Sequence, residues 1–207
     1  MHRTARRGPG RPPAAKSAET RGRILRTARE VFAEVGYDAA TFQEIAVRAD
    51  LTRPAINHYF PSKRVLYRQV VGDAVALVID VGAQAATQET TFTGRLQAFL
   101  RAARTAHEDE QSLAGFLMTS VLDSQRHPEL GGDDHDALAA IRRFVRWALD
   151  DRTAEPTDDE VEALVAMLLG LGFYAGFVGP ADRLAGITET FLAVVGGRSI
   201  GPDRADG

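Results

Sequence analysis

Apolar residues recur along most of this chain at the spacing of an α-helix, and this periodicity restricts the fold more than any other feature. Between about Glu19 and Val35 they stand three or four positions apart, which places them on one side of a helix. No segment alternates apolar and polar residues for long enough to predict a strand. The sequence therefore predicts an all-α protein with about nine helices.

Capping residues and helix breakers set the ends of the first two helices. The helix that starts near Glu19 is expected to end at Gly36, because glycine commonly follows a helix C-terminus. Thr41 and Glu44 have the spacing of a capping box and predict a short second helix. Asp50 falls in the turn after it, where aspartate tolerates the left-handed backbone that such turns often need.

A third and a fourth helix follow almost without a break. Thr52 is expected to cap the third helix, Pro54 is tolerated in its first turn, and Pro61 ends it. Ser62 is expected to cap the fourth helix, which begins at Lys63 with Val65, Leu66 and Val70 as its first apolar positions. Five more helices are predicted, roughly at residues 93–107, 109–124, 135–150, 157–178 and 181–195.

The charges are divided unequally between the two parts of the chain. Residues 1–71 contain 14 Lys/Arg and 6 Asp/Glu, whereas residues 72–207 contain 11 and 22. This division indicates that the N-terminal part binds a polyanion, although charge runs also occur on solvated faces. We expect a disordered basic arm at 1–18, a nucleic-acid-binding domain at 19–71, a helical domain at 72–200 and a flexible tail at 201–207.

The chain has no cysteine, which excludes disulfides, thiolate metal sites and a cysteine nucleophile. Its basic N-terminal stretch has no apolar segment of the secretory kind, so we expect a cytoplasmic protein.

The third helix is expected to turn unusual side chains away from the core. At 100° per residue, Thr52, Ile56 and Phe60 share its inner face. Small, polar and aromatic residues occupy the remaining positions, where a solvated helix usually carries Lys, Glu, Gln or Arg. Two short helices joined by a tight turn, with such residues on the second, describe a helix-turn-helix, whose second helix lies in the DNA major groove.

Each outward residue of this helix has a use at a base edge. Arg53 can bind guanine with two hydrogen bonds and Asn57 can pair with adenine, while Pro54 and Ala55 can contact thymine methyl groups. His58 can donate or accept a hydrogen bond. The residues expected at phosphate oxygens are Thr41, Thr52, Tyr59 and Lys63.

Residues 20–70 resemble the DNA-binding domain of the TetR family of bacterial transcriptional regulators. The matching positions are Phe32, Gly36, Thr41, Ile45, Ala46, Tyr59, Phe60, Lys63, Leu66 and Tyr67. Asp50 replaces a common glycine, and Asn57 stands where the family often has an aromatic residue, so the operator sequence does not follow from the resemblance. The resemblance implies that the third helix recognises bases, the fourth connects the domains, and the C-terminal helices bind a small molecule and form a homodimer.

A short motif in the N-terminal arm points to the minor groove. Gly10-Arg11-Pro12 is close to the core of an AT-hook, although Pro9 stands where such motifs carry arginine. We expect Arg7 and Arg11 to enter the minor groove. The alternative is a disordered tail that attracts DNA nonspecifically.

The C-terminal part is rich in large apolar residues, most of which should form the core. Those expected to line a cavity for an apolar effector are Phe99, Phe116, Met118, Trp147, Met167 and Tyr174. His107, Asp123, His127 and Tyr174 are candidates for binding the effector's polar group.

The longest uncharged run, residues 163–179, is expected to be a buried helix rather than a membrane span. Gly172 and Gly176 permit close helix contact within it. With the last helix it is expected to form a four-helix dimer interface, although both helices have an alternative place in the core. The residues assigned to this interface are Leu171, Phe177, Ile187 and Phe191.

The acidic stretch at 133–136 favours a helix N-terminus over a metal site, and no cofactor is expected. The leading interpretation is a ligand-released repressor that binds a palindromic operator as a homodimer. A nonspecific architectural DNA-binding protein is the second interpretation. An enzyme is disfavoured because the sequence has no Gly-x-Ser-x-Gly, His-x-x-x-His or phosphate-binding loop.

Overall fold

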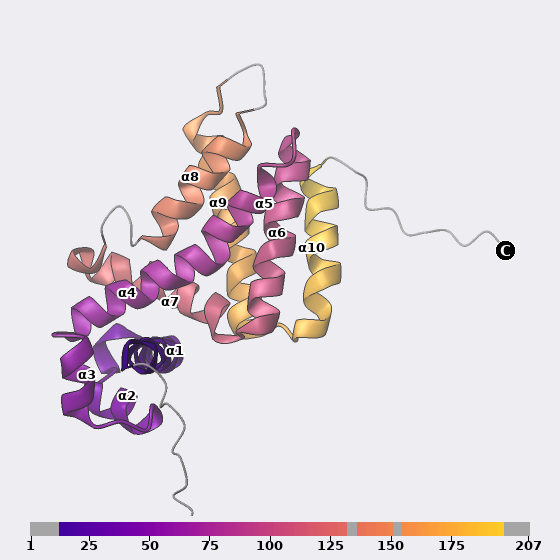
Figure 1. Ribbon diagram of the computed structural model, residues 1–207. Helices are drawn as coiled ribbons and strands as arrows, with labels where there is room; N and C mark the ends of the chain where they lie inside the picture. Colours follow the sequence, from indigo (N-terminus) through magenta and orange to yellow (C-terminus); the bar gives the residue numbers. More distant parts are fainter. Residues whose placement is uncertain (1–12, 132–135, 151–154, 197–207) are drawn as a thin grey trace, which may run out of the picture.

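The computed structural model describes residues 13–131, 136–150 and 155–196, and these residues form helices and connecting loops without a strand. In Figure 1 the helices α1–α3 lie at one end, and α4 leads from them to the C-terminal helices. The elements are α1 (Pro13–Ala39), α2 (Phe42–Arg48), α3 (Arg53–Tyr59), α4 (Lys63–Val75), η1 (Ala76–Asp80), α5 (Val81–Ala86), α6 (Phe92–Asp109), α7 (Ser112–Arg126), η2 (Pro128–Leu130), α8 (Ala137–Ala148), α9 (Asp158–Phe173), η3 (Tyr174–Val178) and α10 (Ala181–Val195). The predicted all-α class is confirmed.

Two boundaries differ from the predictions. α1 begins at Pro13, so residues 13–18 are helical rather than part of a disordered arm. α4 continues through the π-helical turn η1 into α5, and the expected domain boundary at 71/72 therefore lies inside a helix. Arg7 and Arg11 lie outside the described residues, as do positions 133–135 of the acidic stretch. Asp136, the last residue of that stretch, caps α8 by accepting N–H groups of Leu138 and Ala139.

Gly36 interrupts α1 with φ 73° and ψ 178°, a backbone conformation that is essentially restricted to glycine. The predicted end of the first helix is therefore confirmed as a break. Lys63, at the start of α4, holds the turn that follows. Its ammonium donates to the carbonyl oxygens of Tyr37, Asp38 and Ala40 at 2.6, 3.1 and 3.1 Å.

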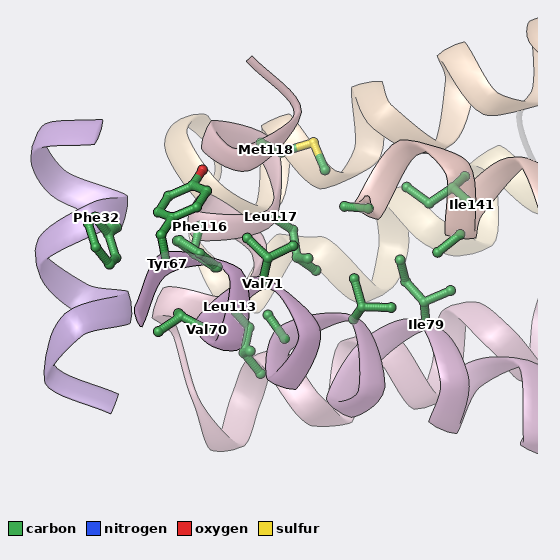
Figure 2. Packing of buried hydrophobic residues seen from close by; sticks show 14 of the residues in the cluster. Phe32, Tyr67, Val70, Val71, Ile79, Leu113, Phe116, Leu117, Met118 and Ile141 are labelled. Atoms are coloured by element: carbon green, nitrogen blue, oxygen red, sulfur yellow. The ribbon is translucent and has the colours of Figure 1, made fainter. Parts of the chain in front are cut away.

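An aromatic cluster joins the N-terminal helices to the C-terminal ones. The ring centroids of Phe32 and Tyr67 are 4.9 Å apart, and those of Tyr67 and Phe116 are 5.8 Å apart. These residues come from α1, α4 and α7 and are all buried. Figure 2 shows them at one end of the apolar core, which extends past Val71 and Leu117 toward Ile79 and Ile141. One core therefore runs through both parts of the chain.

Glycines let the C-terminal helices approach closely. A Cβ atom on Gly176 would lie 2.6 Å from the backbone nitrogen of Gly115, so η3 crosses α7 at backbone contact. Gly172 faces the Met118 side chain, whose sulfur and terminal methyl group would lie 3.0 Å from an added Cβ atom. The close contact predicted for Gly172 and Gly176 therefore forms within the monomer, against α7.

The expectation that residues 163–179 form a buried helix is wrong for the monomer. Asp158–Val178 is, by length and composition alone, the one candidate membrane span among the described residues, yet only 17% of its most apolar window is buried. Met167, Phe173 and Phe177 are 43%, 51% and 49% exposed. With Val194 of α10, also exposed, they define an apolar surface that we call the α9–α10 face.

Candidate nucleic-acid interface and ligand cavity

Local hydrogen bonds fix the geometry of α2 and the turn after it. The Thr41 hydroxyl accepts the N–H of Glu44 at 3.1 Å, as predicted for half of a capping box. The Glu44 carboxylate instead accepts from Arg48 at 2.8 Å. Asp50 has a φ of 51°, and the N–H groups of Asp50 and Leu51 close a Schellman motif on carbonyls of α2. The left-handed backbone predicted at Asp50 is confirmed.

α3 is capped and packed much as the sequence indicated. The Thr52 hydroxyl accepts the N–H of Ala55 at 3.3 Å, and Pro54 lies in the first turn. Ile56 and Phe60 are buried, which fixes the rotation of the helix about its axis. Thr52 is exposed rather than buried, because it precedes the first turn and only its hydroxyl contacts the helix.

The face of α3 opposite this core points to solvent. Arg53, Pro54, Asn57 and His58 are exposed, and Ala55 is half-buried. The predicted base-contacting residues therefore share one accessible surface, at the end of the molecule far from α10 (Figure 1). A short capped helix that presents a guanidinium, an amide and an imidazole carries the donors and acceptors that major-groove recognition uses.

The four residues expected to contact DNA phosphates differ in their exposure and in their hydrogen bonds. Thr41 and Thr52 are exposed, and each hydroxyl keeps its own proton to donate, because it serves its helix only as an acceptor. Tyr59 is half-buried, with its ring centroid 5.3 Å from that of His58. Lys63 has another role: an ammonium has three N–H donors, and all three go to the carbonyls named above. The ammonium has no donor left for a phosphate in this conformation.

α7 holds the N-terminal helices at both of its ends. At its start, the buried Arg29 of α1 donates to Ser112 at 3.0 Å and forms an ion pair with Glu110. Near its end, the buried Asp123 accepts the Tyr37 N–H at 3.0 Å and the Tyr67 hydroxyl at 2.9 Å. Burial, with Asp123 beside it, raises the pKa of Tyr67 well above its usual range, so this hydroxyl keeps its proton.

A third contact joins α7 to the turn after Gly36. His127 Nε2 lies 3.0 Å from the Asp38 carboxylate, and its Nδ1 lies 3.4 Å from Glu129. The hydrogen bond to Asp38 raises the pKa of His127, and the same contact lowers the pKa of Asp38. Asp123 and His127, two candidates for binding an effector's polar group, therefore serve the contact between domains.

A cavity of about 110 Å³ lies between η1, α6, α7, α8, α9, η3 and α10. Its walls are mostly apolar, formed by residues that include Phe99, Leu117, Met118, Ile141, Leu168 and Leu184. Three polar side chains join them: Arg104, His107 and Thr188. The Thr188 hydroxyl donates to the Leu184 carbonyl at 2.7 Å, whereas Nδ1 of His107 is buried without a partner among the described residues.

Four of the six residues expected to line an effector cavity lie outside this cavity. Phe116 is part of the aromatic cluster, and Met167 is exposed on α9. Trp147 is 37% exposed, with the Arg95 guanidinium 4.7 Å from its ring centroid. Tyr174 packs against Gly179. Only Phe99 and Met118 line the cavity, together with His107 from the polar candidates.

The residues assigned to a dimer interface remain partly accessible in the monomer. Phe177 is 49% exposed, and Leu171, Ile187 and Phe191 are half-buried. Leu171 also lines the cavity, so the two predicted sites meet at this residue.

The matches to known sequences cover less than half of the chain. Residues 24–70 match the family described as "Bacterial regulatory proteins, tetR family". Over 84 residues the chain is 38% identical to the HTH-type transcriptional activator FasR of Mycolicibacterium smegmatis, and over 60 residues it is 42% identical to the HTH-type transcriptional repressor BepR of Brucella suis. These matches cover 41% and 29% of this chain, but only 38% and 29% of those relatives.

Solved structures resemble the chain over most of its length. A TetR-family transcriptional regulator from Agrobacterium tumefaciens has a TM-score of 0.69 and 18% identity, with 86% of this chain and 97% of that chain covered. A TetR-like transcriptional regulator from Rhodococcus sp. RHA1 has a TM-score of 0.65 and 18% identity, with 87% and 97% covered. At these identities the similarity shows a shared fold.

Proposed function

Because the N-terminal domain of this chain belongs to the tetR family of bacterial regulatory proteins, we propose that the protein is a sequence-specific transcriptional regulator controlled by a small molecule. The observation that carries this proposal is the outward face of α3. Arg53, Asn57 and His58 are exposed on a helix whose rotation is fixed by Ile56 and Phe60. Regulation of transcription places the protein with the DNA, in the cytoplasm of a bacterium.

The α9–α10 face supports assembly as a homodimer. Phe173 and Phe177 lie with their ring centroids 5.2 Å apart, Met167 and Val194 border one hollow, and all four side chains are about half exposed. Exposed apolar side chains in such number often mark an interface. A symmetric pair of helices from each copy would bury it as a four-helix bundle. A two-fold dimer presents two recognition helices to a palindromic operator, with half-sites about 34–36 Å apart.

We propose repression as the sign of regulation and release by an effector as its mechanism. Of the two relatives named above, one is an activator and the other a repressor, so repression rests on the family resemblance alone. An effector that fits the cavity better in a DNA-incompetent arrangement shifts the population toward it. α7 is suited to transmit the change, because Leu117 and Met118 line the cavity while Asp123 holds the N-terminal helices.

DNA binding is tested by fluorescence anisotropy on the protein's own upstream DNA and on a scrambled duplex of equal length. We expect wild-type protein to prefer the upstream DNA by about three orders of magnitude or more. Changing Asn57 and His58 together to alanine should remove most of this preference. Gln125→Ala, which deletes an exposed amide on α7, is the matched control and should bind as wild type does.

The same measurement distinguishes the proposed function from the second interpretation, a nonspecific architectural protein. A nonspecific architectural protein would bind both duplexes equally and would keep its affinity after Arg53, Asn57 and His58 are changed to alanine, because phosphate contacts carry no sequence information. That outcome would overturn the proposed function.

A further inference from the structure

His107 is the buried polar group that the fold does not explain. Its side chain is 9% exposed, it lines the cavity, and its Nδ1 has no hydrogen-bond partner among the described residues. A buried polar atom without a partner destabilises the folded state, so proteins keep few of them. A buried Nδ1 without a partner, on a histidine in the wall of a cavity, indicates a group that arrives from outside.

The other polar side chains around the cavity are already engaged. Thr188 donates to the Leu184 carbonyl, and the guanidinium of Arg104 is 3.6 Å from the Glu108 carboxylate. A buried water typically makes two to four hydrogen bonds. This apolar cavity offers it few partners besides the imidazole, so an ordered water satisfies His107 poorly.

We propose that the effector is a compact apolar molecule with one hydroxyl group, a phenol or an alcohol, which hydrogen-bonds to the His107 imidazole. This inference rests on the proposed function in assigning the cavity to an effector. A hydroxyl both donates and accepts, so it pairs with either tautomer of a neutral imidazole. A carboxylate suits the cavity less well, because walls such as Leu117 and Leu168 would desolvate its charge and the one cation among the lining residues, Arg104, already pairs with Glu108.

The cavity volume sets the size of the molecule. An engineered apolar cavity of about 150 Å³ binds benzene, and the present cavity of about 110 Å³ is slightly smaller. A single substituted ring therefore requires only a small separation of α6 and α10. A longer effector would have to open the cavity further.

The test compares two probes of nearly equal shape, p-cresol and p-xylene, in which a hydroxyl replaces a methyl group. Their dissociation constants are measured by calorimetry on the full-length protein without DNA. We expect the preference for p-cresol over p-xylene to fall by about tenfold or more in His107→Leu. Thr105→Val removes an exposed hydroxyl of α6 that donates to the Arg101 carbonyl and does not line the cavity, so it should leave the preference within about twofold of wild type.

Folding of the variant provides a second, independent readout. Replacing an unpaired buried polar group with an apolar one of similar size is neutral or stabilising, so His107→Leu should melt at the same temperature as the free wild type or higher. Lower stability of His107→Leu, an unchanged probe preference, or failure of both probes to bind would each overturn the proposal.

Failure of the hydroxyl site can be distinguished from failure of the proposed regulatory function. If p-cresol binds through His107 but leaves the operator complex intact, the hydroxyl site stands and ligand control of DNA binding fails. If the protein binds DNA specifically but neither probe binds, the hydroxyl site fails and the regulator stands.

Discussion

At the scale of single residues, Gly36 determines how α1 passes into the helix-turn-helix. Its φ of 73° and ψ of 178° exclude other residues in practice, while a Cβ atom there would meet only Asp123 at 3.7 Å. Gly36→Ala is therefore expected to destabilise the fold by about 1–3 kcal/mol through backbone strain alone. Gly22→Ala, in the helical part of α1, should be neutral or stabilising by up to about 1 kcal/mol. Urea unfolding of both variants checks this, and equal effects would contradict it.

The contact between His127 and Asp38 should make the stability depend on pH. The pKa of His127 is higher in the folded state than in the unfolded state. The stabilisation from its protonated form is therefore complete below the pKa of the unfolded state and is lost as pH rises through the pKa of the folded state. The pKa of Asp38 is lower in the folded state than in the unfolded state. The stabilisation from its ionised form is therefore lost as pH falls through the pKa of the folded state. The contact should therefore stabilise the fold most between roughly pH 4 and 6.5.

Urea midpoints at about pH 5.5 and about pH 8.5 measure this effect on the histidine side. We expect His127→Gln to lose more stability at the lower pH than at the higher one. His58→Gln removes an exposed imidazole on α3 and should keep the wild-type difference between the two conditions. If His127→Gln behaves like His58→Gln, the contact contributes nothing in solution.

Sequence reasoning at this scale succeeded where the cause was local. Asp50, Thr52 and Ser62 were placed correctly because turns and caps depend on residues three or four positions away. The role of Lys63 in the turn was not predicted, because its partners, the carbonyls of residues 37, 38 and 40, are distant in the sequence. A lysine near a predicted DNA surface gives no sign that its ammonium is already engaged.

At the scale of helices, the crossing of η3 over α7 depends on two glycines at backbone contact. A Cβ atom on Gly176 would lie 2.6 Å from the nitrogen and 2.7 Å from the Cα of Gly115, and neither atom can move independently of its helix. Gly176→Ala should therefore cost about 1–3 kcal/mol. The control is Gly170→Ala, where nothing lies within 4 Å of the added methyl group and a modest gain is expected. A thermal melt that ranks the two variants in the opposite order would refute the crossing.

Helix positions were largely predictable, and the exceptions have physical reasons. α6, α7, α8 and α10 lie within a few residues of their predicted ranges, because glycine, proline and capping residues flank them. The continuation of α4 through η1 into α5 was missed, since a π-helical turn shifts the apolar periodicity on which the prediction relied. The early start of α1 was missed because its first turns pack little apolar surface.

At the scale of the whole molecule, the α9–α10 face should hold two copies together. Phe173→Asp places a charge on this face and is expected to give monomers, which bind an operator far more weakly because they lose one half-site. Leu122→Asp changes a residue of α7 with similar exposure, 53% against 51%, and should leave the protein dimeric. Light scattering gives the mass of each variant. A monomeric wild type, or a dimer that withstands Phe173→Asp, would contradict the proposed interface.

The location of the cavity could not be obtained from the sequence. Phe99 and Phe116 look alike as apolar positions, yet Phe99 lines the cavity while Phe116 packs against Tyr67 in the core. The difference arises from the packing of several helices, which local periodicity does not encode. The outward face of α3 was predictable because one short helix with two buried residues fixes it.

The central claim is that α3 contacts bases through its outward face, and binding-site selection from random duplexes tests it most directly. The wild-type protein should select two half-sites related by two-fold symmetry. Asn57→Ala should relax the preference at one position in each half-site, at a cost of about 1–3 kcal/mol per contact, and leave the other positions unchanged. An Asn57→Ala variant that binds all sequences more weakly by the same factor, with its base preferences intact, would contradict the claim.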